Sequence, residues 1–349
     1  MIIYDTIIIG GGQAGLSVAY FLRRSSLEYL ILDNQKKPGG AWLETWESLQ
    51  LFSPTQFSSI SGWQMPKSKG EYPTKKEFID YLNAYQERYD FPVQRNTAVI
   101  QVEKESGIFK IVTNRGVFHA KTVVSTTGTA KNPFVPNYPN QSDFEGTQLH
   151  SVEYRNPMIF NGKKVLVVGG GNSGAQILSE VSKVAEAKWV TLEPPQFMPE
   201  DIDGRYLFNQ ANSSYLDNNT QNFEEEVSLS DIVQVESVKE GLKRGIYKAV
   251  RPFHSFYKHG VIWQNGEKEV FHAVIWCTGF RANLQHLEAL NIIEDNRVKT
   301  KNTRSLKEPN LWLVGYGKWT GFASATIYGV GKTARATANE IRAHFKTES

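Results

Sequence analysis

The sequence predicts an α/β protein built from two Rossmann-like domains, with the second domain inserted in the first. Three observations support this prediction. A unit of strand, glycine-rich loop, helix and second strand occurs twice, and each copy is followed by an alternating apolar stretch that is typical of an antiparallel β-meander. An apolar strand at 311–314 and a helix at about 333–345 then remain to complete the first domain.

The first glycine unit begins with residues 6–9, a short apolar run that is typical of a buried parallel strand. The loop Gly10-Gly11-Gly12-Gln13-Ala14-Gly15 fits G-x-G-x-x-G, and we expect a helix at 16–24 and a strand at 29–32. Such glycines allow a tight turn, close approach to a pyrophosphate and close packing of helix on strand. The helix N-terminus offers N–H groups to the phosphates. Asp33, 23 residues after Gly10, is expected to accept hydrogen bonds from both ribose hydroxyls.

The second glycine unit repeats this order from Lys164. A strand is expected at 165–168, a helix at 175–182 and a second strand at 189–192, around the loop Gly169-Gly170-Gly171-Asn172-Ser173-Gly174. Glu193 stands at the end of that strand, 24 residues after Gly169. One such loop also occurs in ordinary turns. Two copies with the same flanking elements favour two dinucleotide sites, the first for FAD and the second for NAD(P).

The meanders set the expected domain boundaries. Residues 99–124 alternate, with breaks at Ser106-Gly107 and Arg115-Gly116, and close on Thr127-Gly128. Residues 261–276 repeat this pattern around a turn at Asn265-Gly266 and close on Thr278-Gly279. Each Thr-Gly pair is expected beside its dinucleotide, although either pair alone is typical of an ordinary strand end. We expect an FAD domain at 1–150, an NAD(P) domain at 151–280 with a mobile polar insert near 209–229, and completion of the FAD domain at 281–349.

Composition excludes several other classes of protein. The chain has 39 basic and 36 acidic residues and no basic cluster, so we expect no nucleic-acid partner. Cys277, the only cysteine, excludes an intrachain disulfide, a Cys-rich zinc site and a redox-active C-x-x-C pair, and no metal site is expected. A single cysteine is typical of a reducing cytoplasm. The first apolar stretch is too short for a signal peptide, and no apolar run is long enough for a transmembrane segment.

Further motifs resemble the flavin-containing monooxygenase superfamily, the class B flavoprotein monooxygenases, over nearly the whole chain. Phe144-x-Gly146-x-x-x-His150-x-x-x-Tyr154 fits the family pattern F-x-G-x-x-x-H-x-x-x-[F/Y]. Pro38-Gly39-Gly40-Ala41-Trp42 resembles the flavin-contacting G-G-x-W segment, and Trp276-Cys277-Thr278-Gly279-Phe280 the inter-domain A-T-G-[F/Y] hinge. The short bacterial NAD(P)/FAD-dependent oxidoreductases (the CzcO-like branch) are the members most similar to this chain.

The resemblance implies a set of site residues. His150 and Tyr154 belong to the family pattern, while spacing alone indicates a structural role for His150. Tyr154, where Baeyer–Villiger relatives usually carry Trp, favours oxygenation of heteroatoms. The residues expected to contact FAD are Gly10, Gly12, Gln13, Ala14, Gly15, Asp33, Gly40, Ala41, Trp42, Val99, Thr127, Gly128, Gly315 and Gly317. Those expected to contact NAD(P) are Gly169, Gly171, Asn172, Ser173, Gly174, Leu192, Glu193, Thr278, Gly279 and Phe280.

Three positions depart from the family. Phe52 stands where larger members carry an Asn thought to support the flavin C4a-hydroperoxide, and a phenyl ring cannot donate that hydrogen bond. Glu193 stands near the place of the Arg that grips the 2′-phosphate of NADPH, so NADH is expected to serve at least as well as NADPH. Lys318 replaces an Asp near the ribityl chain, where it either pairs with phosphate or is solvated.

The function expected from these features is oxygenation of soft nucleophiles (sulfides, amines) by O2 through a C4a-(hydro)peroxyflavin, with poor coupling. The nicotinamide would first transfer hydride to the flavin. The alternative is an NAD(P)H-dependent reductase of a small disulfide, quinone or redox protein without oxygen transfer. A redox sensor for a metal-transport system is less favoured, because no effector module is visible. Relatives are often dimers, which leaves a homodimer open.

Overall fold

The computed structural model describes residues 2–199, 231–321 and 323–347. The chain forms two compact units: unit 1 contains Met1–Leu43, Thr55–Asn132 and Arg281–Ser349, and unit 2 contains Glu44–Pro54 and Pro133–Phe280. The boundary predicted at residue 150 therefore lies inside unit 2, because the strand that ends at His150 pairs with a strand of unit 2. The insert predicted near 209–229 lies outside the described residues.

Unit 1 is built on a parallel sheet whose strands come from both ends of the chain. Its parallel part has the order β19-β6-β1-β2-β3. These strands are β1 (Ile3–Ile9), β2 (Tyr29–Leu32), β3 (Val93–Gln94), β6 (Gly116–Ser125) and β19 (Leu311–Leu313). The antiparallel strands around it are β4 (Val99–Glu105), β5 (Ile108–Thr113), β17 (Thr300–Lys301) and β18 (Arg304–Ser305), and a separate hairpin pairs β15 (Ile293–Glu294) with β16 (Arg297–Val298).

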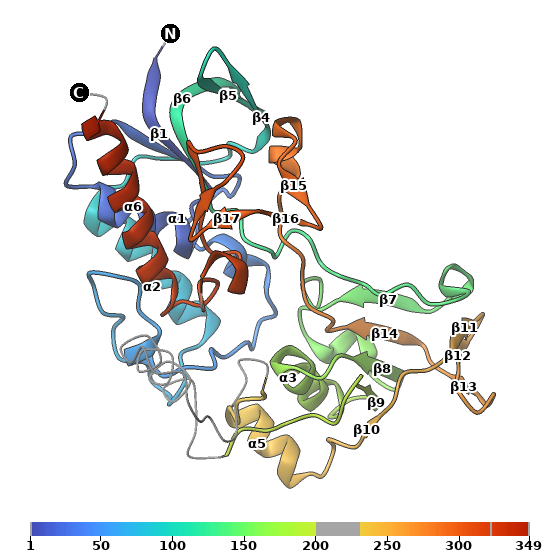
Figure 1. Cartoon of the computed structure of the whole chain (residues 1–349). Helices are drawn as coiled ribbons and strands as arrows, with labels where there is room; N and C mark the ends of the chain where they lie inside the picture. Colours follow the sequence, from blue (N-terminus) through green and yellow to red (C-terminus); the bar gives the residue numbers. More distant parts are fainter. Residues whose placement is uncertain (1, 200–230, 322, 348–349) are drawn as a thin grey trace, which may run out of the picture. The chain divides into compact units, whose positions relative to one another are not determined.

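The helices of unit 1 are α1 (Gln13–Leu22), α2 (Lys75–Tyr89) and α6 (Val330–Thr347). In Figure 1 the red C-terminal helix α6 lies beside the blue α1, so the last part of the chain packs with the first. The predicted completion of this unit by a C-terminal strand and helix is therefore seen in the structure. No helix within the described ranges combines the length and the apolar character that a membrane span requires.

Unit 2 repeats the parallel sheet with the order β10-β9-β8-β14-β7 (Figure 1). Its strands are β7 (Thr147–His150), β8 (Lys164–Val168), β9 (Glu186–Val190), β10 (Ala249–Val250) and β14 (Ala273–Trp276). Its helices are α3 (Asn172–Val181) and α5 (Glu236–Lys243), and its antiparallel meander is β11 (Ser255–Tyr257), β12 (Gly260–Ile262) and β13 (Lys268–Val270). The 3-10 helices of the chain are η1 (Gly40–Glu44), η2 (Thr55–Phe57), η3 (Gln141–Asp143), η4 (Pro157–Phe160), η5 (Gln285–Leu290) and η6 (Lys318–Thr320).

Comparison with the predicted elements confirms the fold class, two Rossmann-like sheets each with an antiparallel meander, and corrects two details. The turn at Asn265-Gly266 joins β12 to β13, while residues 274–276 belong to β14, a central parallel strand between β8 and β7. The strand predicted at 189–192 is β9 and ends at Val190, because Val190 is the last residue paired with β8.

Two candidate dinucleotide sites

The loop between β1 and α1 has two positions that only glycine can occupy. Gly10 has a φ of +108°, and a Cβ atom there would lie 2.8 Å from the carbonyl oxygen of Thr126. A Cβ on Gly15 would lie 1.9 Å from the carbonyl oxygen of Gly10. Both distances are below the closest contacts of real Cβ atoms, so the fold itself requires glycine here.

Gly12 lies in the same loop but faces open space. A Cβ on Gly12 would meet only the Cα of Gly40, at the ordinary contact distance of 3.6 Å, and its φ of −83° suits any residue. Gly12 is the N-cap of α1, no side chain caps this helix, and its first turn has no acidic residue. An open glycine in front of an uncapped helix N-terminus suits a pyrophosphate. The residues present therefore fit the phosphates of FAD.

The G-G-x-W segment packs directly on this loop. A Cβ on Gly40, which has a φ of +53°, would lie 2.8 Å from the Cα of Gly12. The Trp42 indole donates to Oε1 of Gln13 over 3.0 Å, and the Gln13 amide donates to the carbonyl of Ala325 over 3.1 Å. Three segments that are distant in sequence thus meet at the start of α1. Gly315 joins them, since its Cβ would lie 2.8 Å from that of Ala14.

Asp33 stands at the end of β2, as predicted, and its carboxylate already has a cationic partner. Its side chain is 4% exposed and forms an ion pair with Arg95, the residue after β3. Burial raises the pKa of Asp33, while Arg95 acts in the opposite direction. A Cβ on Gly11 would lie 2.7 Å from Oδ2 of Asp33, so the carboxylate lies against the glycine loop. This is the position expected for a residue that binds the adenosine ribose.

Unit 2 contains the same loop geometry between β8 and α3. Gly169 has a φ of +131°, its Cβ would lie 2.1 Å from the carbonyl oxygen of Cys277, and a Cβ on Gly174 would lie 2.2 Å from that of Gly169. A Cβ on Gly171 would meet nothing within 4 Å. Gly171 is the N-cap of α3, again without a side-chain cap or an acidic residue in the first turn. The second site therefore also fits a pyrophosphate.

The residue that matches Asp33 in unit 2 is Thr191, two positions before the predicted Glu193. Ile9 pairs with Leu32 just before Asp33, and Val168 pairs with Val190 just before Thr191. Thr191 is 1% exposed and lies 3.3 Å from a Cβ built on Gly170. Leu192 is 79% exposed and Glu193 is also exposed. Glu193 is thus a surface carboxylate just beyond the ribose position.

His150 and Tyr154 both bond within unit 2. Val152 donates its backbone N–H to Nδ1 of His150, so the proton is on Nε2, which donates to the carbonyl of Gly279 over 3.0 Å. Burial lowers the pKa of His150, and its ring packs edge-on against Phe280. Tyr154 is 1% exposed and donates to Glu180 over 2.8 Å. These contacts support a structural role for the family pattern at these two residues.

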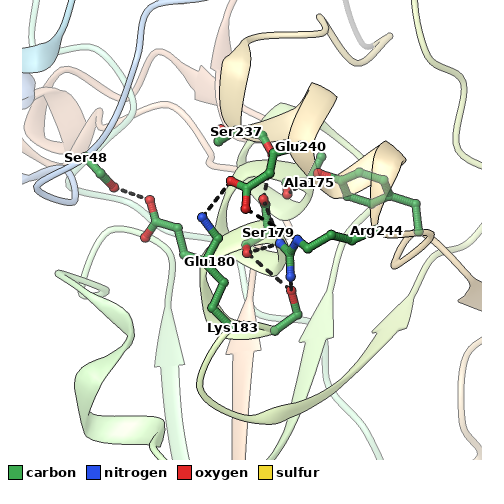
Figure 2. Close-up of polar contacts among 10 residues, drawn as sticks. Ser48, Ala175, Ser179, Glu180, Lys183, Ser237, Glu240 and Arg244 are labelled. Carbon is green, nitrogen blue, oxygen red and sulfur yellow. Dashed lines mark hydrogen bonds and ion pairs between the residues drawn. The ribbon is translucent and has the colours of Figure 1, made fainter.

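Polar contacts anchor α3, whose N-terminus faces the second glycine loop. In Figure 2, Glu180 accepts from Ser48, and Lys183 pairs with Glu240 of α5. Arg244 donates to the carbonyl of Ser179 over 2.6 Å. Residues 44–54, which include Phe52, are therefore tied to α3 within unit 2.

The other predicted residues fall into two groups. Some bond within the protein: Thr127 donates to the carbonyl of Asn283, Thr278 to that of Phe134, and Asn172 to that of Asp231. Others are open or exposed: Gly128, Gly279 and Gly317 have positive φ with nothing near a Cβ, Val99, Phe52, Ser173 and Ala41 are at least partly exposed, and Lys318 is exposed.

Sequence reasoning missed Arg95 and Arg251, the residues after β3 and β10. Arg251 donates to the carbonyl oxygen of Thr191 over 3.1 Å and to its hydroxyl over 3.3 Å. The available signal was weak, because strands of two residues give no readable periodicity. Their importance appears only once the strand register is known.

Comparison with known proteins agrees with this geometry. The family described as pyridine nucleotide-disulphide oxidoreductase matches residues 7–315. The chain belongs to this family. It is 31% identical over 346 residues to an oxidoreductase of Geobacillus kaustophilus described as uncharacterized and CzcO-like, covering 98% of this chain and 99% of that protein.

Solved structures place the chain further. A flavin-containing monooxygenase from Stenotrophomonas maltophilia shares 43% identity, with a TM-score of 0.91 and 99% coverage of both chains. The bacillithiol disulfide reductase Bdr from Bacillus cereus, with 19% identity, a TM-score of 0.74 and coverage of 98% and 100%, shares the fold. The chain is an oxidoreductase of the flavin monooxygenase superfamily, an enzyme that works with FAD, NAD(P)H and O2.

Proposed function

We propose that this enzyme binds FAD in unit 1 and NAD(P)H in unit 2, and oxygenates a soft nucleophile such as a sulfide or an amine. The observation that carries the assignment of the sites is the repeated loop, in which the fold requires two glycines while Gly12 and Gly171 face open space. When bound, FAD would supply hydride acceptance and reaction with O2. The overall reaction balances as NAD(P)H, H⁺, O2 and sulfide giving NAD(P)⁺, water and sulfoxide.

The role of the chain in this reaction is to bind and to position. Gly10, Gly12 and Gly15 would hold the FAD pyrophosphate, with Asp33 at the ribose and Gly40 to Trp42 beside the loop. Gly169, Gly171 and Gly174 would do the same for the nicotinamide cofactor. His150 would fix Gly279 and Phe280 through its hydrogen bond to the carbonyl of Gly279.

NADH should serve at least as well as NADPH. Glu193 is exposed two residues beyond Thr191, the position that corresponds to the ribose-binding Asp33. A carboxylate there suits a ribose diol and repels a 2′-phosphate.

The second candidate is an NAD(P)H-dependent reductase of a small acceptor. The fold shared with a bacillithiol disulfide reductase favours it. Cys277 does not support a thiol mechanism, because it is 9% exposed and burial raises its pKa. Direct reduction of a small acceptor by the flavin would remain.

One experiment separates the two functions. The NADH-reduced enzyme is mixed with O2 in a stopped-flow spectrometer, and sulfoxide or N-oxide formation is compared with O2 uptake over a panel of sulfides and amines. The monooxygenase proposal expects a transient spectrum blue-shifted from oxidised flavin and an oxygenated product. Direct return to oxidised flavin, with no product from any substrate, would favour the reductase.

A further inference from the structure

The edge of the second glycine loop carries an arginine that no carboxylate neutralises among the described residues. Arg251 follows β10, and its side chain is exposed. Its Nη1 donates to the carbonyl oxygen of Thr191 over 3.1 Å and to the Thr191 hydroxyl over 3.3 Å. Thr191 packs against Gly170, so Arg251 is bonded to a residue that lines the loop.

Unit 1 contains the same arrangement with one change. Asp33 donates its backbone N–H to the carbonyl of Gln94, and Thr191 donates its own to that of Val250, each over 3.0 Å. Arg95 and Arg251 are the next residues after these two carbonyls. The two arginines are therefore equivalent by strand register, but Arg95 pairs with the Asp33 carboxylate while Arg251 faces a neutral threonine.

This difference indicates different ligands. In unit 1 the carboxylate accepts hydrogen bonds and the arginine charge is neutralised, which suits a ribose with two free hydroxyls. In unit 2 the acid is absent and the guanidinium keeps its charge. A guanidinium binds a phosphate through charge-assisted hydrogen bonds, often in pairs. The ribose of a dinucleotide held by Gly169 to Gly174 would lie at this edge of the loop.

We propose that Arg251 recognises the 2′-phosphate of NADPH and so allows the enzyme to use NADPH beside NADH. This rests on the proposed binding of the nicotinamide cofactor in unit 2. Arg251 and Glu193 then act in opposite directions on the same phosphate, and together they set the ratio between the two cofactors.

The test compares both cofactors in Arg251→Gln. We expect KM for NADPH to rise about 10- to 100-fold, the usual range for loss of a charge-assisted hydrogen bond, with KM for NADH unchanged. Binding of adenosine 2′,5′-bisphosphate should weaken by a similar factor, while binding of 5′-AMP should not change. Arg251→Lys should retain part of the preference, since it keeps the charge and loses the planar fork.

Two further variants sharpen the result. Thr191→Asp would recreate the Asp33–Arg95 pair and should weaken NADPH as Arg251→Gln does, with NADH retained. Lys248→Gln removes one exposed positive charge just before β10 and should leave both cofactors unchanged.

Contrary outcomes are distinguishable. If Arg251→Gln weakens both cofactors equally, or neither, Arg251 is not the phosphate partner. The Gly171→Ala enzyme shows whether unit 2 binds the cofactor at all. If Gly171→Ala lowers the use of NADH and NADPH while Arg251→Gln has no effect, only the role of Arg251 is refuted. If Gly171→Ala has no effect, the cofactor site itself is misplaced and both proposals fail.

Discussion

Gly12 and Gly171 occupy the same position in the two loops, and at both the polypeptide leaves room for a Cβ atom. Gly15 and Gly174 do not, because a Cβ at either would collide with a backbone carbonyl. Substitutions at the first pair therefore report on the ligand, while those at the second report on the fold.

Gly12→Val should produce folded protein without FAD. The branched side chain would fill the space in front of α1 that a pyrophosphate must enter, while the polypeptide meets only an ordinary contact at Gly40. Flavin content per chain and circular dichroism of purified protein measure this. Gly70→Val, at an exposed glycine without positive φ, is the matched control and should keep its flavin. A Gly12→Val protein with normal flavin content would refute the FAD assignment.

Phe52 is expected to limit coupling. A phenyl ring cannot donate a hydrogen bond to an oxygen species at the flavin, so much of the reductant should be lost as hydrogen peroxide. Phe52→Asn should slow the decay of the blue-shifted transient and raise the ratio of product to NADH consumed. Phe52→Leu, which also lacks a donor, is the control. Equal decay rates in all three proteins would show that stabilisation comes from another group.

Glu193 is expected to disfavour NADPH by charge. Glu193→Arg should raise kcat/KM for NADPH by about 5- to 150-fold, which corresponds to roughly 1–3 kcal/mol, and should affect NADH little. The ratio of kcat/KM for the two cofactors measures the effect, and Glu193→Gln separates loss of repulsion from gain of attraction. A wild-type preference of tenfold or more for NADPH would contradict the proposed role of Glu193.

At the scale of elements, α2 shows what a sequence signal can provide. Thr74 caps α2 by accepting from the backbone N–H of Glu77, and Glu77 accepts from the N–H of Thr74. This capping box was present in the sequence, yet the helix was not predicted. Its hydroxyls hold the preceding segment: Tyr81 donates to the carbonyl of Trp63 over 2.5 Å and Tyr85 to that of Ser61 over 2.6 Å.

Removal of this cap should destabilise unit 1 in a pH-dependent way. Thr74→Ala should lower the free energy of unfolding by about 0.5–2 kcal/mol at neutral pH. Burial opposes the shift, but hydrogen bonds from Thr74, Lys69 and Ser68 lower the pKa of Glu77 to about 2. A lowered pKa stabilises the fold above the ordinary pKa of Glu and loses this effect as the pH falls towards 2.

The difference between wild type and Thr74→Ala should therefore shrink as the pH falls from about 5. Urea unfolding at several pH values measures it, and Thr74→Ser, which keeps the cap, is the control. A difference that does not depend on pH would show that the Glu77 carboxylate takes no part in the cap.

Strand register explains which parts of the sites could be predicted. Both glycine loops could, because each lies between an apolar strand and a helix. The acidic residue of unit 1 could, because β2 ends at Leu32 as predicted. Its counterpart in unit 2 could not, because Thr191 lies 22 residues after Gly169 whereas Asp33 lies 23 after Gly10, and only the pairing of β8 with β9 reveals this.

Over the whole molecule, one structural unit occurs twice with different charges at the ribose position. The sheet order, loop glycines and uncapped helices agree between the units, while Asp33 with Arg95 is replaced by Thr191 with Arg251. A shared fold explains how two dinucleotides can be bound, and these pairs explain how each unit could select its own.

This duplication predicts that the two cofactors can be lost separately. Gly171→Ala should retain FAD and its visible spectrum, because unit 1 is unchanged. It should raise KM for both NADH and NADPH, since a methyl group would enter the space where the pyrophosphate must approach the N-terminus of α3, although the polypeptide has no atom within 4 Å of it. Reduction by dithionite, which needs no nicotinamide, should proceed as in wild type. Gly12→Val should show the opposite pattern, with no flavin to reduce. If Gly171→Ala instead lost FAD and kept its affinity for the nicotinamide, the assignment of the cofactors to the two units would have to be exchanged.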